Sequence, residues 1–350
     1  MKSENITTKI IIDALVRLGD EIKTNIERQP FEQTIERCCK RNPFFEPSSV
    51  RFALLAVAEW LSEDVLTAFA AKYPCNRSPK TILCITAGNI PCAGFADWMY
   101  VLLTNNRFLG RLSHKDDVLL PFLSGLLTAK EPLMASRVSF AAANQPIGSS
   151  QTGIYDAVIA TGSDASAQYF DYYFKSVPHI IRKNRYSVAI LSPNAGAEDL
   201  KGIADDCLLH LGLGCRNVRK IFLPFGFDLS RLTAVFADYP PVQTNNKYRN
   251  NIDYQRAIRI LNNVPFVDGG NVLFEQNEMS ESPLGVVFYE FYASFEGVLA
   301  RLAADKEKIQ CVVSDIRRDG LTPCGFGQKP RIDEFADGVD IMAFLLSLTA

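Results

Sequence analysis

The sequence predicts an α/β fold with a doubly wound parallel sheet, followed by a second α/β domain. From Lys80 onward, short continuous apolar runs alternate with longer segments of helical period, as in chains that build a sheet buried on both faces. The chain has 350 residues, 47% hydrophobic and 22% charged, which suffices for two domains with their own cores. Polar residues and glycines follow several of the apolar runs, as ligand-binding residues do in open α/β sheets.

The composition excludes several classes of function. A net charge of −2 provides no basic field for nucleic acid. No apolar run reaches the roughly 18 residues that predict a membrane span, and residues 1–13 lack the apolar stretch of a secretory signal. The nine cysteines and three histidines show no spacing typical of a metal site. We therefore expect a cytoplasmic protein with reduced thiols and no metal.

The first 75 residues carry helical patterns. Isoleucines and leucines within residues 10–18 are spaced for one helix, and Ser48-Ser49 is placed to begin a second helix that continues to about Val65.

From Lys80 the period changes to that of buried strands. The strands predicted for the first sheet are 81–86, 107–112, 137–141, 157–160 and 186–191. Helices are predicted between them at 94–103, from Asp116 or Asp117 to Ala129, and at 163–175.

The second half repeats the alternation. Its predicted strands are 218–223, 286–289 and 310–313, the polar stretch 240–251 reads as a surface excursion, and an apolar helix closes the chain within 332–348. We expect a helical segment and a first α/β domain in 1–195, a second α/β domain in 196–324, and a tail in 325–350.

Cys215 is the first candidate for chemistry. A helical pattern over 198–211 ends near Gly212, a strand begins at Val218, and the sequence Gly-Leu-Gly-Cys-Arg-Asn connects them. The glycines leave room for a substrate carbonyl, and Arg216 next to the cysteine favours the thiolate. The alternative is that Cys215 is a small buried apolar side chain, as most cysteines are.

Three further motifs follow predicted strands, although the Gly-x-Gly-x-x-Gly dinucleotide fingerprint is missing. They are Gly88-Asn89-Ile90-Pro91, Arg111-Leu112-Ser113 and Thr161-Gly162-Ser163. Their order, with Cys215 following, resembles the aldehyde dehydrogenase superfamily, and more closely its LuxC-type acyl-CoA reductase branch. The residues 325–330, Gly-Phe-Gly-Gln-Lys-Pro, and 335–340, Phe-Ala-Asp-Gly-Val-Asp, are similar to that branch as well. The resemblance covers about residues 80–345 and implies an aldehyde-dehydrogenase-like fold. It also implies a cofactor domain within 1–195, a catalytic domain within 196–324, and a tail, 325–350, that packs across the cleft.

The resemblance assigns roles at the reacting centre. Cys215 matches the covalent nucleophile, and Asn89 matches the amide that donates to the developing oxyanion. Glu281 loosely matches the glutamate that holds the nicotinamide ribose, with the spacing off by about one residue. The alternative for Asn89 is a turn residue, and for Glu281 a surface acid.

Further residues match the positions that hold a nicotinamide cofactor. Arg111 stands where the superfamily usually has a lysine at the adenosine ribose, with Ser113 and Lys115 just beyond. Two cations there favour NADPH, with NADH as the other option. Gly162 and Ser163 match the turn at the cofactor phosphate. The alternatives are a solvated loop for Arg111 and Lys115 and a plain helix cap for Ser163.

The function that the resemblance implies is NAD(P)H-dependent reduction of an acyl thioester, on CoA or a carrier protein, to an aldehyde. Oxidising relatives carry a water-activating glutamate, where this chain reads Lys-Asn-Arg-Tyr-Ser at 183–187. One rival is a thioesterase or acyltransferase without cofactor, which would need a base such as His210. Another is a non-catalytic scaffold that pairs with an acyl-activating enzyme. A homo-oligomer is compatible with the resemblance, although no dedicated oligomerisation hairpin is evident.

Overall fold

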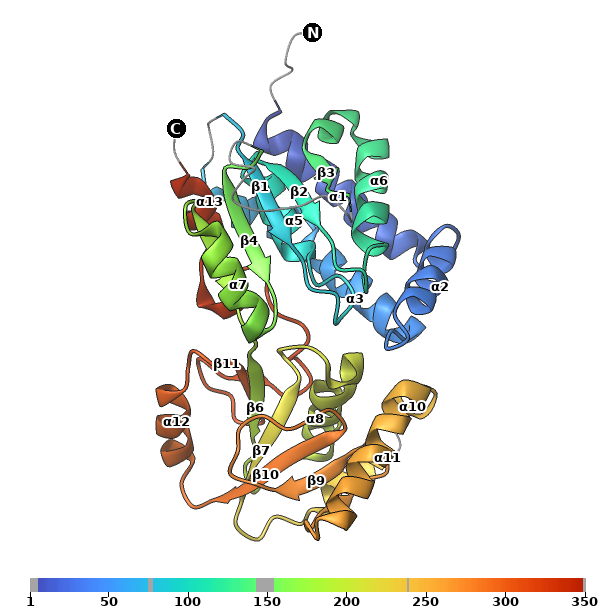
Figure 1. The fold of residues 1–350 in the computed structure, drawn as a ribbon, viewed down its shortest axis with the longest axis vertical. Coiled ribbons are helices and arrows are strands. Elements are labelled where there is room, and N and C mark those ends of the chain that lie inside the picture. Colours follow the sequence, from blue (N-terminus) through green and yellow to red (C-terminus); the bar gives the residue numbers. More distant parts are fainter. Residues whose placement is uncertain (1–5, 75–77, 143–153, 238, 349–350) are drawn as a thin grey trace. The chain divides into compact units, whose positions relative to one another are not determined.

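The computed structural model describes residues 6–74, 78–142, 154–237 and 239–348. It divides into two compact units, each described separately below (Figure 1). The first unit comprises Met1–Asn184 and Arg331–Ala350, and the second comprises Arg185–Pro330.

The first unit is built on a five-stranded parallel sheet with the strand order β3-β2-β1-β4-β5. The strands are β1 (Thr81–Ile85), β2 (Arg107–Arg111), β3 (Val138–Phe140), β4 (Ala157–Thr161) and β5 (His179–Arg182). The chain runs outward from β1 to β3 and then returns to place β4 on the other side of β1. The strand order therefore reverses between β1 and β4, the point where open α/β sheets bind ligands.

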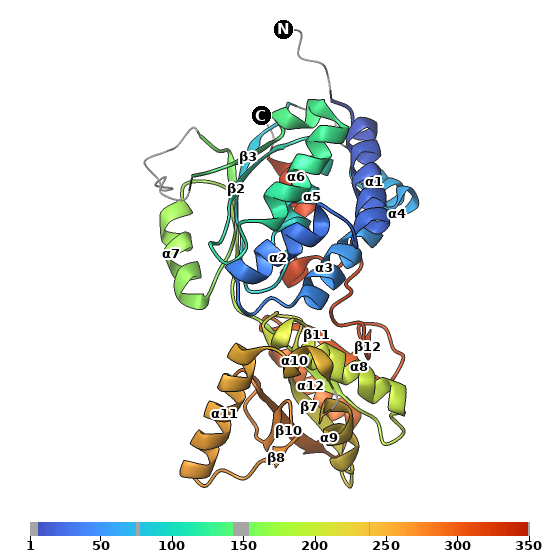
Figure 2. The ribbon, with the colours of Figure 1, turned by 90° about the vertical axis from the view of Figure 1, so that its right-hand side faces the viewer.

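Helices cover both faces of this sheet unequally (Figure 2). The helices of the unit are α1 (Thr8–Asn25), α2 (Phe31–Arg41), α3 (Pro47–Trp60), α4 (Glu63–Ala71), α5 (Phe95–Leu103), α6 (Leu119–Lys130), α7 (Asp164–Phe174) and α13 (Ile341–Ser347), with short 3-10 turns at Pro132–Ser136 and Ala336–Gly338. One face, with Ile82 and Phe108, packs into a large core shared with α1, α3, α5, α6 and α13. The other face, with Leu83 and Val158, packs on α7 through Phe174.

The N-terminal helices are confirmed, but one boundary differs from the prediction. The segment expected as one helix from Ser48 to Val65 is two helices, α3 and α4. Glu46 is the N-cap of α3, and the Ser49 hydroxyl accepts a hydrogen bond from the Glu46 backbone N–H at 3.3 Å. Ser49 thus caps the helix from inside its first turn, which local composition does not distinguish from a cap that precedes it.

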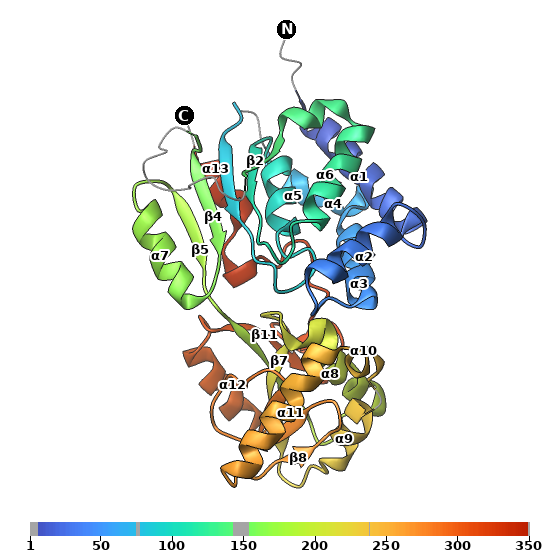
Figure 3. The ribbon, with the colours of Figure 1, turned by 45° about the vertical axis from the view of Figure 1, so that its right-hand side comes forward.

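The second unit contains a seven-stranded sheet with the order β12-β11-β6-β7-β10-β9-β8, parallel except for the β8–β9 pair. The strands are β6 (Tyr186–Ile190), β7 (Val218–Pro224), β8 (Val267–Asp268), β9 (Leu273–Gln276), β10 (Val286–Tyr292), β11 (Ile309–Ser314) and β12 (Thr322–Pro323). The helices are α8 (Ala197–Leu208), α9 (Ser230–Ala237), α10 (Pro240–Gln243), α11 (Asn246–Leu261) and α12 (Phe295–Ala304), with a 3-10 turn at Leu209–Gly212. Figure 3 shows α12 on one side of this sheet and α8 and α11 on the other.

The polar stretch 240–251 forms α10 and the first turns of α11, where we expected a surface excursion. The Asn245 side chain accepts from the backbone N–H of Tyr248 at 3.0 Å and so caps α11. Tyr248 is buried and donates to the backbone carbonyl of Asn271 at 3.1 Å. One buried face is enough to fix a helix whose remaining surface is polar.

Residues 186–191 were expected in the first sheet, but β6 lies between β11 and β7 in the second. Tyr186, Val188 and Ile190 pack against Val298 of α12 and join the core of the second unit. The fifth strand of the first sheet is β5, which the sequence analysis did not identify.

The two units meet in the sequence after Asn184 and after Pro330. The sequence analysis expected the domain boundaries at 195 and 324 instead. The last segment of the chain packs within the first unit. The Tyr100 hydroxyl donates to the Ile332 carbonyl at 2.7 Å, and the Tyr73 hydroxyl donates to Asp340 at 2.8 Å. Packing of the tail across a cleft stays a prediction.

Candidate active site

The first unit gathers three predicted motifs at one edge of its sheet. Arg111 ends β2, Asn89 follows β1 and Gly162 follows β4, and these strands are neighbours. Ile85 pairs with Arg111 on one side and with Ala160 on the other, so the three strand ends lie at the same level. This edge is the carboxyl edge at the reversal of strand order, where a dinucleotide would be expected to bind.

The loop after β1 is held by contacts from two other loops. A Cβ atom added to Gly88 would lie 2.7 Å from the Ser113 Oγ, so the loops after β1 and β2 touch at this glycine. The buried Asn42 side chain donates to the Gly88 carbonyl at 3.1 Å. Asn89 therefore occupies a position that its neighbours fix.

Asp116 secures the same loop from the start of α6. Its carboxylate accepts from the backbone N–H groups of Cys92 at 3.2 Å and Leu119 at 3.4 Å. Burial raises the pKa of Asp116 to about 6, against the lowering effect of these two hydrogen bonds. The sequence analysis expected Asp116 or its neighbour to begin α6, and the helix begins at Leu119 instead.

A buried ion pair connects the helix after the Asn89 loop to the strand beside Gly162. Both guanidinium Nη atoms of Arg182 donate to the Asp97 carboxylate at 2.7 Å, and the Arg182 carbonyl accepts from the Gly162 N–H at 3.2 Å. Burial alone would lower the pKa of Arg182, but the attraction of Asp97 holds it above its ordinary value. A bidentate pair of this kind fixes geometry, so the loops on either side of the strand reversal are held in register.

The predicted cofactor residues differ in their surroundings. Arg111 is half-buried and its Nη1 donates to the Ala142 carbonyl, which ties the end of β2 to the segment after β3. Lys115 is exposed. Ser163 is the N-cap of α7, with its Oγ accepting from Ser166 N–H at 3.3 Å. The edge thus combines cations, hydroxyl groups and a helix N-terminus, a donor set that fits the phosphates and ribose of a dinucleotide.

In the second unit, Cys215 lies in a sharply bent connection between α8 and β7. The helix ends at Leu208, three residues earlier than the helical pattern suggested. His210, Leu211 and Gly212 then take left-handed backbone conformations, with φ of 55°, 55° and 71°. Only glycine adopts such φ values without strain, so the two non-glycine residues record a bend imposed by the surroundings. Cys215 itself is exposed.

Asn217 fixes this bend from within. It is fully buried, and its Nδ2 donates to the backbone carbonyls of Asp206, Cys207 and Leu209 at 3.0, 3.3 and 2.8 Å. Its Oδ1 accepts from the Gly214 N–H at 2.8 Å. One side chain therefore satisfies the carbonyls at the end of α8 and holds the residue before Cys215.

Arg216, next to the cysteine, contacts the segment that carries Gly325–Gly327; its effect on the Cys215 thiolate stays a prediction. Its Nε donates to the carbonyl of Gly327, and its charge acts on Asp206. The Asp206 carboxylate in turn accepts from the N–H groups of Gly325 and Gly327 at 2.7 and 2.8 Å. Burial raises the pKa of Asp206 to about 7. Arg216 and Asp206 thus hold the Gly325–Gly327 motif against α8.

The stretch that lacks the glutamate of oxidising relatives contacts the cysteine loop directly. The Ser187 hydroxyl donates to the Cys215 backbone carbonyl at 3.0 Å. The same oxygen accepts from the Cys311 backbone N–H at 3.2 Å and lies 3.1 Å from the Cys311 thiol. Ser187 is fully buried at the start of β6, so a small hydroxyl occupies this position and links β11 to the loop.

Arg219 is the cation that the sequence analysis missed. It lies on β7, and its Nη1 donates to the Ser282 carbonyl at 2.8 Å while Nη2 donates to the Gly212 carbonyl at 3.2 Å. Burial lowers its pKa, and the charges of Glu281 and Cys215 act in the opposite direction. Arg219 therefore lies within electrostatic range of both Cys215 and Glu281. Arg219 stands four residues after the cysteine, and adjacency alone favoured Arg216.

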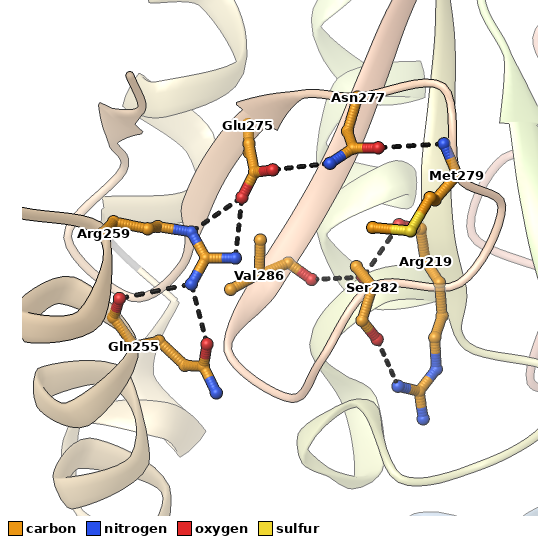
Figure 4. A network of polar contacts seen from close by, with 8 residues as sticks. All are labelled: Arg219, Gln255, Arg259, Glu275, Asn277, Met279, Ser282 and Val286. Carbon is orange, nitrogen blue, oxygen red and sulfur yellow. Dashed lines mark hydrogen bonds and ion pairs between the residues drawn. The ribbon is translucent and has the colours of Figure 1, made fainter. Parts of the chain in front are cut away.

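A polar network positions the loop that carries Glu281 (Figure 4). Arg259 donates to Glu275 through Nε at 2.8 Å, Asn277 donates to the same carboxylate at 2.6 Å, and the Met279 N–H donates to Asn277 at 2.9 Å. On the other side, the Ser282 hydroxyl donates to the Val286 carbonyl at 2.6 Å. Glu281 is exposed between these two attachments.

His210 is a poor candidate for a base beside Cys215. It is 7% exposed, and burial lowers its pKa to about 4. A general base works best when its pKa lies near the working pH, so this imidazole would be neutral but weakly basic at pH 7.

Comparisons with known proteins agree with this architecture. The family model described as Acyl-CoA reductase (LuxC) matches residues 70–227. This confirms the resemblance drawn from the sequence. The match spans every predicted site residue except Glu281. No curated protein sequence matches the chain.

Solved structures show the aldehyde dehydrogenase fold. An NAD-dependent aldehyde dehydrogenase from Sinorhizobium meliloti is 11% identical, with a TM-score of 0.68 over 88% of this chain and 70% of that one. A mutant of aldehyde dehydrogenase C from Pseudomonas syringae, in complex with NAD+ and octanal, is 14% identical, with a TM-score of 0.64 over 90% and 73%. Aldehyde dehydrogenase 21 from Physcomitrella patens is 10% identical, with a TM-score of 0.65 over 89% and 74%. The predicted fold class is confirmed, and family match and fold together support oxidoreductase chemistry on an acyl or aldehyde group.

None of the described helices is long and apolar enough to cross a membrane. Within the described ranges, no group of three or more His, Cys, Asp or Glu side chains is placed to hold a metal ion.

Proposed function

We propose that this protein reduces an acyl thioester, in the first instance a fatty acyl-CoA, to the aldehyde with NADPH. The observation that carries the proposal is an exposed cysteine, Cys215, on the bend between α8 and β7 of an aldehyde dehydrogenase fold. The acyl-CoA reductase family match ends beyond this cysteine, at residue 227. NADH as cofactor, a carrier-protein thioester as donor, an acyl-activating partner enzyme and a cytoplasmic location are further parts of the same expectation.

The first step belongs to Cys215. Its thiolate attacks the thioester carbonyl, a carbon–sulfur bond to Cys215 forms, the bond to CoA breaks, and the CoA thiolate leaves and takes up a proton. Negative charge develops on the carbonyl oxygen during the attack. Asn89 and the Cys215 backbone N–H are the proposed donors to that oxygen.

The carboxyl edge of the first sheet would hold the cofactor. Arg111, Ser113 and Lys115 would face its adenosine ribose, and Gly162 and Ser163 its phosphates. Glu281 would hold the nicotinamide ribose. Bound there, the nicotinamide would supply the hydride that converts the acyl group to the aldehyde.

The residues at 183–187 favour reduction over hydrolysis. Within the stretch where oxidising relatives carry a carboxylate, Ser187 uses its hydroxyl to hold the Cys215 carbonyl. Without a general base for water, hydrolysis of the acyl-enzyme loses a factor of about 10²–10⁴. The acyl-enzyme should therefore persist until reductant arrives.

The test is to mix the protein with acyl-CoA alone. About one equivalent of CoA should be released per active site, followed by little more, and mass spectrometry should find the acyl group on the Cys215 peptide. Adding NADPH should discharge it as aldehyde. Cys215→Ala should abolish the burst and turnover while leaving NADPH binding intact, whereas Cys311→Ala, as a matched control, should retain the burst.

Two outcomes would contradict the proposal. Fast, continuous CoA release without cofactor would point to a thioesterase, with His210 and Glu281 as the bases to replace. Cofactor binding without any burst or aldehyde would point to the non-catalytic scaffold.

A further inference from the structure

Arg219 connects two loops that approach the nucleophile from different parts of the chain. Its guanidinium donates to the Gly212 carbonyl in the Cys215 loop. It also donates to the carbonyl of Ser282, next to Glu281 (Figure 4). The Ser282 hydroxyl returns a hydrogen bond to the Arg219 carbonyl at 2.9 Å. Ser282 is 2% exposed, so this reciprocal contact is sheltered from water.

Three titratable side chains near the cysteine loop are uncharged at neutral pH. Burial raises the pKa of the Cys207 thiol and of Tyr248 above their ordinary values, and His210 is neutral, so none of these carries charge. Cys311 on β11 has its thiol beside the Ser187 hydroxyl.

Among the described residues, the charged side chains on the segments around the loop include Asp206 at the end of α8, Arg216, Arg219 and Glu281. Arg216 donates to Gly327 and acts on Asp206. Arg219 interacts electrostatically with both Cys215 and Glu281. A guanidinium close to a sulfur favours the thiolate over the thiol, and burial strengthens the effect because water screens it less.

We propose that Arg219 is the positioning residue of the nucleophile: it joins the Cys215 loop to the Glu281 loop and stabilises the Cys215 thiolate, with Glu281 competing for the same guanidinium. The effect of Arg219 on enzymatic turnover rests on the proposed function. The ionisation of Cys215 does not, because it can be measured without substrate or cofactor.

The test follows alkylation of Cys215 by iodoacetamide from pH 5 to 10, quantified by mass spectrometry of the Cys215 peptide in the full-length protein. Only the thiolate reacts. Arg219→Gln should move the midpoint of the rate profile to higher pH and slow alkylation at pH 7 by about tenfold, with the limiting rate at high pH unchanged; tenfold corresponds to one pH unit. Arg219→Lys, which keeps the charge, should lie close to the unmodified protein.

Glu281→Gln is an independent test, in which the midpoint of the alkylation profile should move in the opposite direction. Glu281 is exposed, so this variant should fold even if Arg219→Gln does not. Removing the competing carboxylate should move the midpoint to lower pH. Arg216→Gln is the matched control, because its guanidinium is directed to Gly327, and its profile should not move.

An unchanged midpoint in both Arg219→Gln and Glu281→Gln would overturn the proposal. So would a rate change of the same factor at every pH, since that marks altered access to the sulfur and no change in its ionisation. A shifted midpoint in a protein that proves unable to reduce acyl-CoA would leave this inference standing and remove the proposed function alone.

Discussion

The two units arrange their candidate site residues in different ways. In the first unit, Asn89, Arg111 and Gly162 follow the carboxyl ends of three neighbouring parallel strands, so the backbone topology alone brings them together. In the second, Cys215 precedes the amino end of β7, on a bend with two left-handed non-glycine residues. Topology does not hold that bend. Buried polar side chains do, and Asn217 makes the largest set of the contacts described above.

The same difference appears in the two buried carboxylates. Asp116 and Asp206 each accept two backbone N–H groups and each have a pKa raised by burial, to about 6 and about 7. Asp116, which follows β2, holds the loop after the neighbouring strand β1, 24 positions away in sequence. Asp206 holds residues 325–327, more than a hundred positions away in sequence, so more of the second unit's site depends on contacts between distant segments.

Replacing Asn217 is the strongest test of the idea that buried polar side chains hold the bend in the second unit. Asn217→Leu keeps the volume but leaves three backbone carbonyls and one N–H without their buried partner, so we expect the second unit to lose about 2–4 kcal/mol of stability. Hydrogen exchange of peptides from residues 197–224, read by mass spectrometry, measures this opening directly.

Asn194→Leu, an exposed change in the same unit, is the control and should leave exchange near that of the unmodified protein. Both tryptophans, Trp60 and Trp98, lie in the first unit, so their fluorescence reports that unit alone. A large shift of the fluorescence midpoint with no change in exchange would show that the bend is not held by Asn217.

Arg111 tests the topological site of the first unit. If its guanidinium meets the 2′-phosphate, Arg111→Ala should lower the affinity for NADPH by about ten- to a hundredfold, because a charge-assisted contact is worth about 1.5–3 kcal/mol. The affinity for NADH should fall much less. Titration with each reduced cofactor measures the two affinities. Lys115→Ala, at the exposed neighbour, should cost less. Equal losses for NADPH and NADH would make Arg111 a ribose or structural contact and remove the NADPH preference.

A further prediction separates the two carboxylates by the pH range over which each affects stability. A folded carboxyl with a raised pKa binds a proton that the unfolded chain has released. The stability it contributes is therefore complete below the ordinary value of 3.8 and is lost as pH rises through the folded pKa. The quantity to follow is the unfolding free energy of the unmodified protein minus that of Asp206→Asn. As the pH rises from about 4, this difference should fall by at most about 1.4 kcal/mol per pH unit, and the fall should end at about pH 7. For Asp116→Asn the fall should end near pH 6.

Urea unfolding from pH 4 to 8 checks this, with tryptophan fluorescence for Asp116→Asn and hydrogen exchange for Asp206→Asn. Differences independent of pH would show that both carboxyls titrate alike in the folded and unfolded states.

The sequence by itself determined the α/β class, most strands, and the residues that follow them. A strand buried in a parallel sheet needs a continuous apolar run, as Thr81–Ile85 has, and the residues that follow such runs share one edge whatever the details of packing. The cysteine was also recognisable, because glycines and a helix-to-strand change surround Cys215.

Only the tertiary structure decided how that cysteine is held and where the two nearby arginines are directed. Arg216 is adjacent in sequence but turns to Gly327, while Arg219 reaches back to Gly212 and Ser282. Likewise, β6 has an apolar pattern that suits either sheet, and its packing on α12 assigns it to the second. Hydrogen bonds between distant segments and the choice of partner for an apolar face depend on where the chain folds in space, and neither leaves a local period in the sequence.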